Sequence, residues 1–397
     1  MQVSATSLAP PAGALPSARR APGGWIRSPL WDGFWILNTL WIAPIVWYCV
    51  YRDPDPYHGP VYLFELILAL CFWVGHRFSS TYLAYFTTAY RPLLKTQRVR
   101  FVWVPLGIAL ATFAFLVPGD DALPWTRGTR IMYLVILDYG LITYHFAAQH
   151  FGFLSLYRLR SGRPRSVLDR RLDRAYALIV GGFMVFVAEL MVGRVFFHEV
   201  WLDPVFDPDW LDSVFVQVQV GGTVFVGLAA AVLLVREVLS GHPSLPRALY
   251  ILSVAGIVVA AFHLRPFLFI LLWTTQHWIA AMGLSTVVAR GNDDPTTSRW
   301  YSLWQGFSRR PWLLALLLIA VSAVLLPIME VEALGPEDQG IAQALVPNIA
   351  NALANSPWVP VLIAVGFVTA FLHYALDRAV FRLSDPEVRK AAKGLFD

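Results

Sequence analysis

Apolar stretches of helical length alternate with short polar loops along most of this 397-residue chain. An α-helix rises about 1.5 Å per residue, so about 20 apolar residues cross a hydrocarbon core about 30 Å thick. The pattern therefore predicts an all-α, polytopic membrane helix bundle with about ten transmembrane helices. The expected spans are residues 33–51, 61–87, 101–118, 131–157, 175–197, 213–235, 248–263, 266–289, 311–329 and 357–380.

The apolar tract 248–289 is too long to be one span. His263, Arg265 and Pro266 interrupt it, and proline disfavours helix continuation and restricts the residue before it. We therefore expect two helices joined by a tight turn at His263–Pro266. The shorter apolar segment 340–355 follows an acidic loop, and we expect it to form an interfacial helix on the outer face.

The composition excludes several classes of protein. Hydrophobic residues make up 57% of the chain and charged residues only 14%, whereas about 25% of an ordinary soluble domain is charged. A soluble fold this apolar would expose large apolar patches, so a cytosolic enzyme, a disordered chain and a secreted disulfide scaffold are all disfavoured. Cys49 and Cys71 lie in apolar segments and are expected to be free thiols.

The positive charges predict the orientation of the bundle. With ten spans, most of the 31 Lys and Arg residues fall on one side, and the opposite loops hold only Arg52, Arg127, Arg130 and Arg265. Positive residues collect on the cytoplasmic side, so both termini are expected there, in a bacterial inner membrane. The expected organisation is a disordered N-terminal tail at 1–24, a transmembrane helical bundle at 25–385 and a cytoplasmic C-terminal tail at 386–397.

Polar side chains inside the spans are the main clue to function, because ionisable groups are costly in a membrane and normally face the bundle interior or a cavity. Four histidines lie on four helices that run from outside to inside, at depths of about 16–24 Å from the outer boundary. They are His76, His145, His277 and His373. This shared depth predicts that their side chains form one cluster.

Such a cluster is typical of a metal site. Neutral imidazole is the commonest metal ligand, and several imidazoles with a carboxylate suit iron, copper, manganese or zinc. His373 and Asp377 are four residues apart and share a helix face. The predicted ligands are His76, His145, His150, His277, His373 and Asp377. Non-haem iron, mono- or dinuclear, is the expected cofactor, with copper, manganese or zinc as alternatives.

His150 lies about one turn deeper than the four histidines. His145 and His150 are five residues apart, which is about 140° around a regular helix. Both reach one site only if their helix contains a π-bulge, and otherwise His150 serves a neighbouring position. For each single histidine, a hydrogen-bonding strut between helices is the alternative role.

Asp377, Gln149 and Arg77 are the predicted catalytic residues. Arg77 either extends to the cytoplasmic surface or anchors a carboxylate or phosphate of the substrate. Glu189, on the fifth span, is a candidate for a further ligand. The remaining histidines are expected in loops or turns outside the cluster: His58, His198, His242 and His263.

Haem is a less favoured cofactor. His263 and His277 are 14 residues apart, a spacing similar to that of the bis-haem membrane cytochromes b. Two haem ligands on a second helix would also be needed, and His145 and His150 are too close together to provide them.

Three short segments carry a resemblance to a known family: 144–150 (YHFAAQH), 75–82 (GHRFSSTY) and 373–377 (HYALD). The first is similar to the YHFG-type motif of the Brp/Blh family, bacterial membrane dioxygenases that cleave carotene. Members of that family are multi-helix proteins whose intramembrane histidines bind iron. The resemblance implies that His145 is an iron ligand. A weaker similarity to the His-rich membrane desaturases and hydroxylases lacks their HxxxH and HxxHH boxes.

Two classes of function are compatible with these residues. The first is an integral-membrane, metal-dependent oxidoreductase that uses O₂ on a hydrophobic small molecule or lipid, with electrons from a cytoplasmic donor. The second is a proton-coupled transporter that uses the same His and Asp residues as a relay. A haem-binding membrane electron carrier is a further alternative. The basic segment 158–174 is expected to contact anionic membrane lipids, and no nucleic-acid partner is expected.

Overall fold

The computed structural model describes residues 22–52, 59–163, 166–192, 208–264, 266–291, 298–333 and 347–396, and this part of the chain contains helices and no strand. Most of the expected tail at 1–24 lies outside these residues, as do His58, Arg194, His198 and the side chain of Glu189. The α-helices are α1 Pro29–Trp35, α2 Thr39–Arg52, α3 Pro60–Leu68, α4 Val74–Phe86, α5 Arg91–Thr96, α6 Val104–Leu116, α7 Arg127–Arg160, α8 Val167–Leu178, α9 Val185–Val192, α11 Pro208–Leu239, α12 Leu245–His263, α13 Pro266–Arg290, α14 Arg299–Arg309, α15 Pro311–Ala333, α17 Pro347–Ala354, α18 Val359–Val380 and α19 Pro386–Ala391.

Within the described residues, short segments of other helix types join or interrupt these helices. Three are π-helical: η2 Ala69–Trp73, η3 Val99–Trp103 and η5 Ile179–Met184. Three are 3₁₀ turns: η1 Pro22–Gly24, η4 Asp120–Ala122 and η7 Lys393–Leu395. π-bulges are rare and often occur at functional sites, and η2 lies immediately before the helical turn that carries His76.

Seven helices within the described residues are long and apolar enough to cross a membrane, which indicates an integral membrane protein. They are Pro60–Phe86, Val99–Leu116, Arg127–Arg160, Ser213–Leu239, Leu245–His263, Pro311–Met329 and Val359–Val380. The pair α1 and α2 would make an eighth span if it crosses as one broken helix. The sequence-based count of ten spans stays a prediction.

The predicted span at 33–51 contains a break between two helices. α1 and α2 meet at an angle of 51°, and Asn38 lies buried at the break. The Asn38 side-chain amide donates to the Trp35 carbonyl at 2.9 Å and to the Gln276 carbonyl of α13 at 3.1 Å. A buried polar residue therefore ends α1 and ties the bend to the neighbouring helix, a role that an apolar stretch in the sequence does not reveal.

The predicted turn between two helices at His263–Pro266 is confirmed. α12 ends at His263, α13 begins at Pro266, and Leu264 between them has an extended backbone. The proline restricts the preceding backbone and cannot continue the helix before it. This division places His277 in the interior of α13, one of the helices closest to the centre of the bundle.

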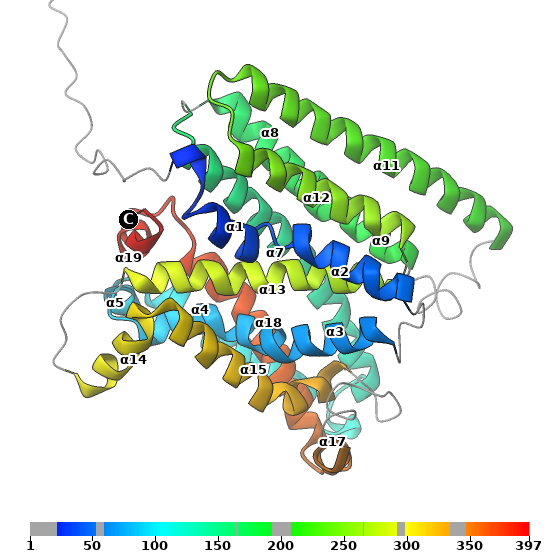
Figure 1. Ribbon diagram of the computed structural model, residues 1–397. Coiled ribbons are helices and arrows are strands. Elements are labelled where there is room, and N and C mark those ends of the chain that lie inside the picture. Colours follow the sequence, from blue (N-terminus) through cyan, green and yellow to red (C-terminus); the bar gives the residue numbers. More distant parts are fainter. Residues whose placement is uncertain are drawn as a thin grey trace, which may run out of the picture.

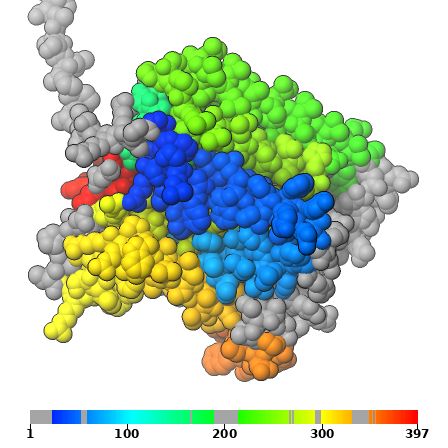
Figure 2. Space-filling model, in the orientation of Figure 1, coloured from blue at the N-terminus to red at the C-terminus, as the bar shows by residue number. Residues whose placement is uncertain are grey.

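Figure 1 shows α13 running through the middle of the molecule, with α4 beside it, α18 packed against α4, and α11 at the outer edge next to α12. The space-filling view in Figure 2 shows that the blue N-terminal helices α1 to α3 cover the centre of this face. One buried hydrophobic cluster links α2, α4, α7, α12 and α13. The C-terminal residues also belong to the packed structure, since Val388, Ala391 and Leu395 are buried.

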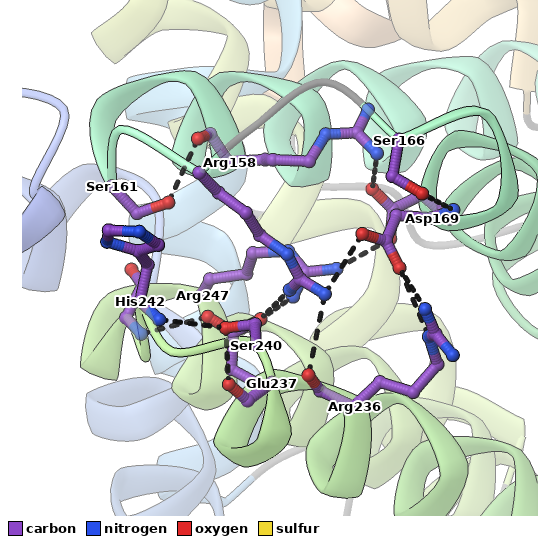
Figure 3. A network of polar contacts seen from close by, with 12 residues as sticks. Arg158, Ser161, Ser166, Asp169, Arg236, Glu237, Ser240, His242 and Arg247 are labelled. Carbon is purple, nitrogen blue, oxygen red and sulfur yellow. Dashed lines mark hydrogen bonds and ion pairs between the residues drawn. The ribbon is translucent and has the colours of Figure 1, made fainter.

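One end of α7, α8, α11 and α12 is joined by a network of ion pairs (Figure 3). Arg247 donates to Asp173 at 2.6 Å and also contacts Glu237. Arg163 bridges Asp169 at 3.0 Å and Glu237 at 2.9 Å. Part of the basic segment 158–174 therefore binds carboxylates within the protein, and the network holds four helix ends together.

Candidate metal centre

Four histidines from four helices meet in the interior of the bundle. His76 lies on α4, His145 on α7, His277 on α13 and His373 on α18, and all four side chains are buried. The ring centroids of His145 lie 4.8 Å from those of His277 and of His373, and the His76 and His373 centroids are 4.7 Å apart. The structure thus brings together the four residues to which the sequence assigns one depth.

The ring nitrogens of this cluster point toward one another. His277 Nε2 lies 3.3 Å from His145 Nε2 and 3.4 Å from His373 Nε2. Two nitrogens bound to one tetrahedral ion at 2.0–2.1 Å would lie about 3.3–3.4 Å apart. Each of the two observed separations therefore matches that of two imidazoles bound to the same metal ion.

Hydrogen bonds to the other ring nitrogens set the tautomers that a metal requires. His277 Nδ1–H donates to Gln149 Oε1 at 2.8 Å, and His76 Nδ1 contacts the carbonyl oxygen of Trp73. In both rings Nε2 then carries the lone pair. The single lone pair of His277 Nε2 cannot accept good hydrogen bonds from two neighbouring nitrogens, whereas a metal ion would accept a lone pair from each ring.

Asp377 supplies the carboxylate of the cluster. Its Oδ2 lies 3.6 Å from His145 Nε2 and its Oδ1 lies 3.6 Å from His373 Nδ1. Oδ1 is buried and forms no hydrogen bond with any described residue. Two sets of three residues therefore have ligand atoms within 4.8 Å of one another: His76, His277 and His373, and His145, His373 and Asp377. These buried His and Asp groups could hold a metal ion.

The π-helical segment η2 and its contact with α15 position His76. The Val74 N–H donates to Ser322 Oγ at 3.1 Å, and the Ser322 hydroxyl donates to the Ala69 carbonyl at 3.3 Å. Ser322 thus satisfies backbone groups at both ends of the irregular segment. Next to His76, a Cβ on Gly75 would lie only 2.5 Å from the Leu318 carbonyl oxygen, so glycine lets α4 approach α15 closely.

Aromatic rings surround the histidines. Phe146 stacks on the His277 ring with centroids 4.0 Å apart, and Trp278 stacks on His76 at 5.9 Å. Tyr374 lies 5.0 Å from His145. Packing of this kind fixes ring orientation and keeps the site apolar, and an apolar shell controls solvent access and the redox potential of a bound metal.

The structure does not bring His150 to the other histidines. α7 is a regular helix through this region, so His150 points elsewhere, and its Nδ1 lies 2.8 Å from the hydroxyl of Tyr250 on α12. This geometry agrees with the alternative in which His150 serves a neighbouring position. α7 therefore lacks the π-bulge that would bring His145 and His150 to one site, whereas the π-helical segment η2 directly precedes α4, the helix that carries His76.

Arg77 also lies outside both ligand sets. Its guanidinium donates to the Thr369 hydroxyl at 3.3 Å and lies 5.5 Å from the centre of the Trp73 ring. Among the other histidines, His242 is exposed, and His263 contacts Gln219 and Thr223 at the end of α12. The pair considered for haem, His263 and His277, therefore lies on two different helices.

A cavity of about 890 Å³ adjoins the cluster and reaches His145, Gln149 and Asp377. Its lining is otherwise mostly apolar and comes from α6, α7 and α18, with contributions from α13 and the C-terminal segment. Its volume lies within the range of about 300–1,000 Å³ that is usual for small-molecule sites.

No protein-family model matches this chain, and no curated protein or solved structure matches it either. The candidate site therefore stands on its own geometry. The four histidines and Asp377 could be predicted from the sequence, but the contacts of Ser322 and Phe146 could not. Helix periodicity gives no sign of these contacts, because it does not tell which side chain of a neighbouring helix lies opposite.

Proposed function

We propose that this protein is an integral-membrane, metal-dependent oxidoreductase that acts on a lipid-soluble substrate. The observation that carries the proposal is the meeting of four buried histidines, in which His277 Nε2 lies 3.3 Å from His145 Nε2 and 3.4 Å from His373 Nε2. A buried carboxylate beside these nitrogens and a large apolar cavity in contact with them support it. Several imidazoles with a carboxylate suit non-haem iron, which when bound supplies the activation of O₂.

The chain's own residues hold and orient the site. Gln149 keeps His277 in the tautomer that presents Nε2, and the Trp73 carbonyl does the same for His76. Phe146 and Trp278 cover two of the rings and exclude water. His145 and Asp377 belong to both the cluster and the cavity wall, so a substrate in the cavity would lie against the ligands.

For the membrane we propose ten spans with both termini in the cytoplasm of a bacterium. To the seven spanning helices this adds the bent pair α1–α2, α13, and the continuous helix from Val167 to Val192. In this orientation the histidines lie toward the cytoplasmic half of the bilayer, where a cytoplasmic electron donor would reach them. A hydrophobic small molecule or lipid would enter from the side.

The proposal is tested by oxygen incorporation. Purified protein loaded with Fe(II) would be incubated with ¹⁸O₂, a reductant and a lipid extract of the host membrane, and the lipids analysed by mass spectrometry. We expect labelled products with the wild type and none with His277→Ala, whereas the matched variant His263→Ala should keep the activity. Iron-loaded, folded protein that labels nothing and instead moves protons across liposomes would favour the transporter.

A further inference from the structure

The cavity beside the metal cluster extends along the bundle. On α7 its lining extends from Leu134 to Leu156, which is about 33 Å at about 1.5 Å per residue. This length is close to the thickness of a hydrocarbon core, about 30 Å. The cavity therefore has the length of one extended lipid chain.

Small residues create the space in this cavity. Ala148 and Gly152 on α7 and Ala375 on α18 belong to its lining. A Cβ built on Gly152 meets nothing within 4 Å, so the groove is open at this position. Leu137 and Tyr144, which also line the cavity, are each 49% exposed, so an apolar molecule can enter from the side of the bundle.

Two arginines stand at one end of this apolar cavity. Arg378 lies near the end of α18 and Arg382 shortly after it, and both are exposed. Within the described residues neither guanidinium forms an ion pair, and Arg378 lies 5.8 Å from the centre of the Tyr144 ring. Asp377 is the one acidic residue of the described lining, and it belongs to the metal cluster.

This charge pattern identifies the chemistry of the occupant. An apolar channel with two arginines at its end complements a long apolar chain that carries one anionic head. Guanidinium groups bind carboxylate and phosphate through paired, charge-assisted hydrogen bonds. A wholly apolar molecule would leave both arginines without a ligand partner.

We propose that the cavity binds a single-chain amphiphile with an anionic head, a carboxylate or a phosphate, held by Arg378 and Arg382. On α18, His373 precedes Arg378 by about 8 Å along the helix axis, and Arg382 follows the end of the helix. With the head at the arginines, the part of the ligand beside the metal ligands is the first part of its apolar chain. That this amphiphile is the substrate rests on the proposed function, whereas its binding does not.

The test is a titration of the metal-free protein in phosphatidylcholine nanodiscs with cis-parinarate, a fluorescent long-chain carboxylate. Because both guanidinium groups are exposed and water screens their attraction for the head, we expect the double variant Arg378→Ala/Arg382→Ala to bind about 10- to 100-fold more weakly. The matched control Arg171→Ala/Arg174→Ala removes two exposed arginines elsewhere and should bind like the wild type. Gly152→Phe should block binding by filling the groove.

Competition separates the head from the chain. Oleate should displace parinarate from the wild type far better than oleyl alcohol, and the arginine variant should abolish this preference. Oleoyl lysophosphatidate tests whether the preferred head is a phosphate. If it competes more strongly than oleate, the head is a phosphate, and if it competes more weakly, the head is a carboxylate. Equal competition by oleate and oleyl alcohol, or unchanged affinity in the arginine variant, would overturn the proposal. Because the titration uses no metal, its failure leaves the metal-site proposal standing.

Discussion

Gln149 offers the sharpest test of how the cluster is organised. Its Oε1 accepts the Nδ1–H of His277 at 2.8 Å, so it fixes both the tautomer and the ring orientation. Gln149→Leu keeps a side chain of similar size but removes the acceptor. His277 would then lose the bond that keeps its proton on Nδ1, and the tautomer protonated on Nε2 cannot bind a metal.

The expected magnitude follows from this one contact. Loss of a hydrogen bond behind a metal-binding histidine typically lowers metal affinity by 10- to 100-fold, which is about 1.4–2.7 kcal/mol. The assay is a competition for Fe(II) or Co(II) between the detergent-purified protein and a chelator of known affinity. Thermal unfolding of the same samples shows whether the variant is folded.

Gln149→Glu is the matched control. The carboxylate keeps an acceptor at the same position and adds a negative charge near the cation, so metal affinity should equal or exceed that of the wild type. Two results would show that Gln149 does not position His277. One is metal binding by Gln149→Leu as tight as that of the wild type, and the other is an equal loss of metal affinity in both variants.

Three further predictions concern stability. Asp173→Asn leaves the buried Arg247 without one of its carboxylates (2.6 Å) and should lower the free energy of unfolding by about 3–5 kcal/mol. Chemical denaturation measures this loss, and the control Arg171→Ala, at an exposed position, should leave the free energy of unfolding nearly unchanged. Ser322→Ala leaves the Val74 N–H without its acceptor (3.1 Å), so the free energy of unfolding should fall by about 1–3 kcal/mol. Metal binding should also weaken. An unchanged melting temperature would mean that Ser322 does not stabilise η2. Burial alone would raise the pKa of Asp169, but its ion pairs with Arg236 and Arg163 bring that pKa below the ordinary value of 3.8. These ion pairs therefore contribute their full stability above the pKa of Asp169 in the unfolded chain, and this contribution disappears as the pH falls through the lower pKa of the folded state. When unfolding is measured from pH 6 to pH 3, Asp169→Asn should lose less stability than the wild type.

The histidine cluster was predictable because depth in a membrane follows directly from position along a helix. A constant rise per residue gives His76, His145, His277 and His373 similar depths once the spans and their directions are assigned. The turn at Pro266 was predictable for a similar reason, since proline acts on the backbone next to it. Both inferences need only local chemistry and the length of a span.

The contacts around the cluster could not be derived in this way. A hydrophobic pattern gives the helix and its depth, but not its rotation against each neighbour, so it left the place of His150 open. Nor does an apolar run reveal the break at Asn38 or the π-helical segment before Val74, because neither changes the composition. The ion pairs of Arg247 join segments far apart in the sequence and depend on tertiary packing.

The central claim is that the cluster of His76, His145, His277, His373 and Asp377 binds metal, and metal analysis of the protein purified in detergent without added chelator tests it most directly. We predict about one or two iron atoms per chain, lost in His145→Ala and in His373→Ala but retained in the control His263→Ala. Wild-type protein that is folded, monodisperse and free of bound metal would contradict the account.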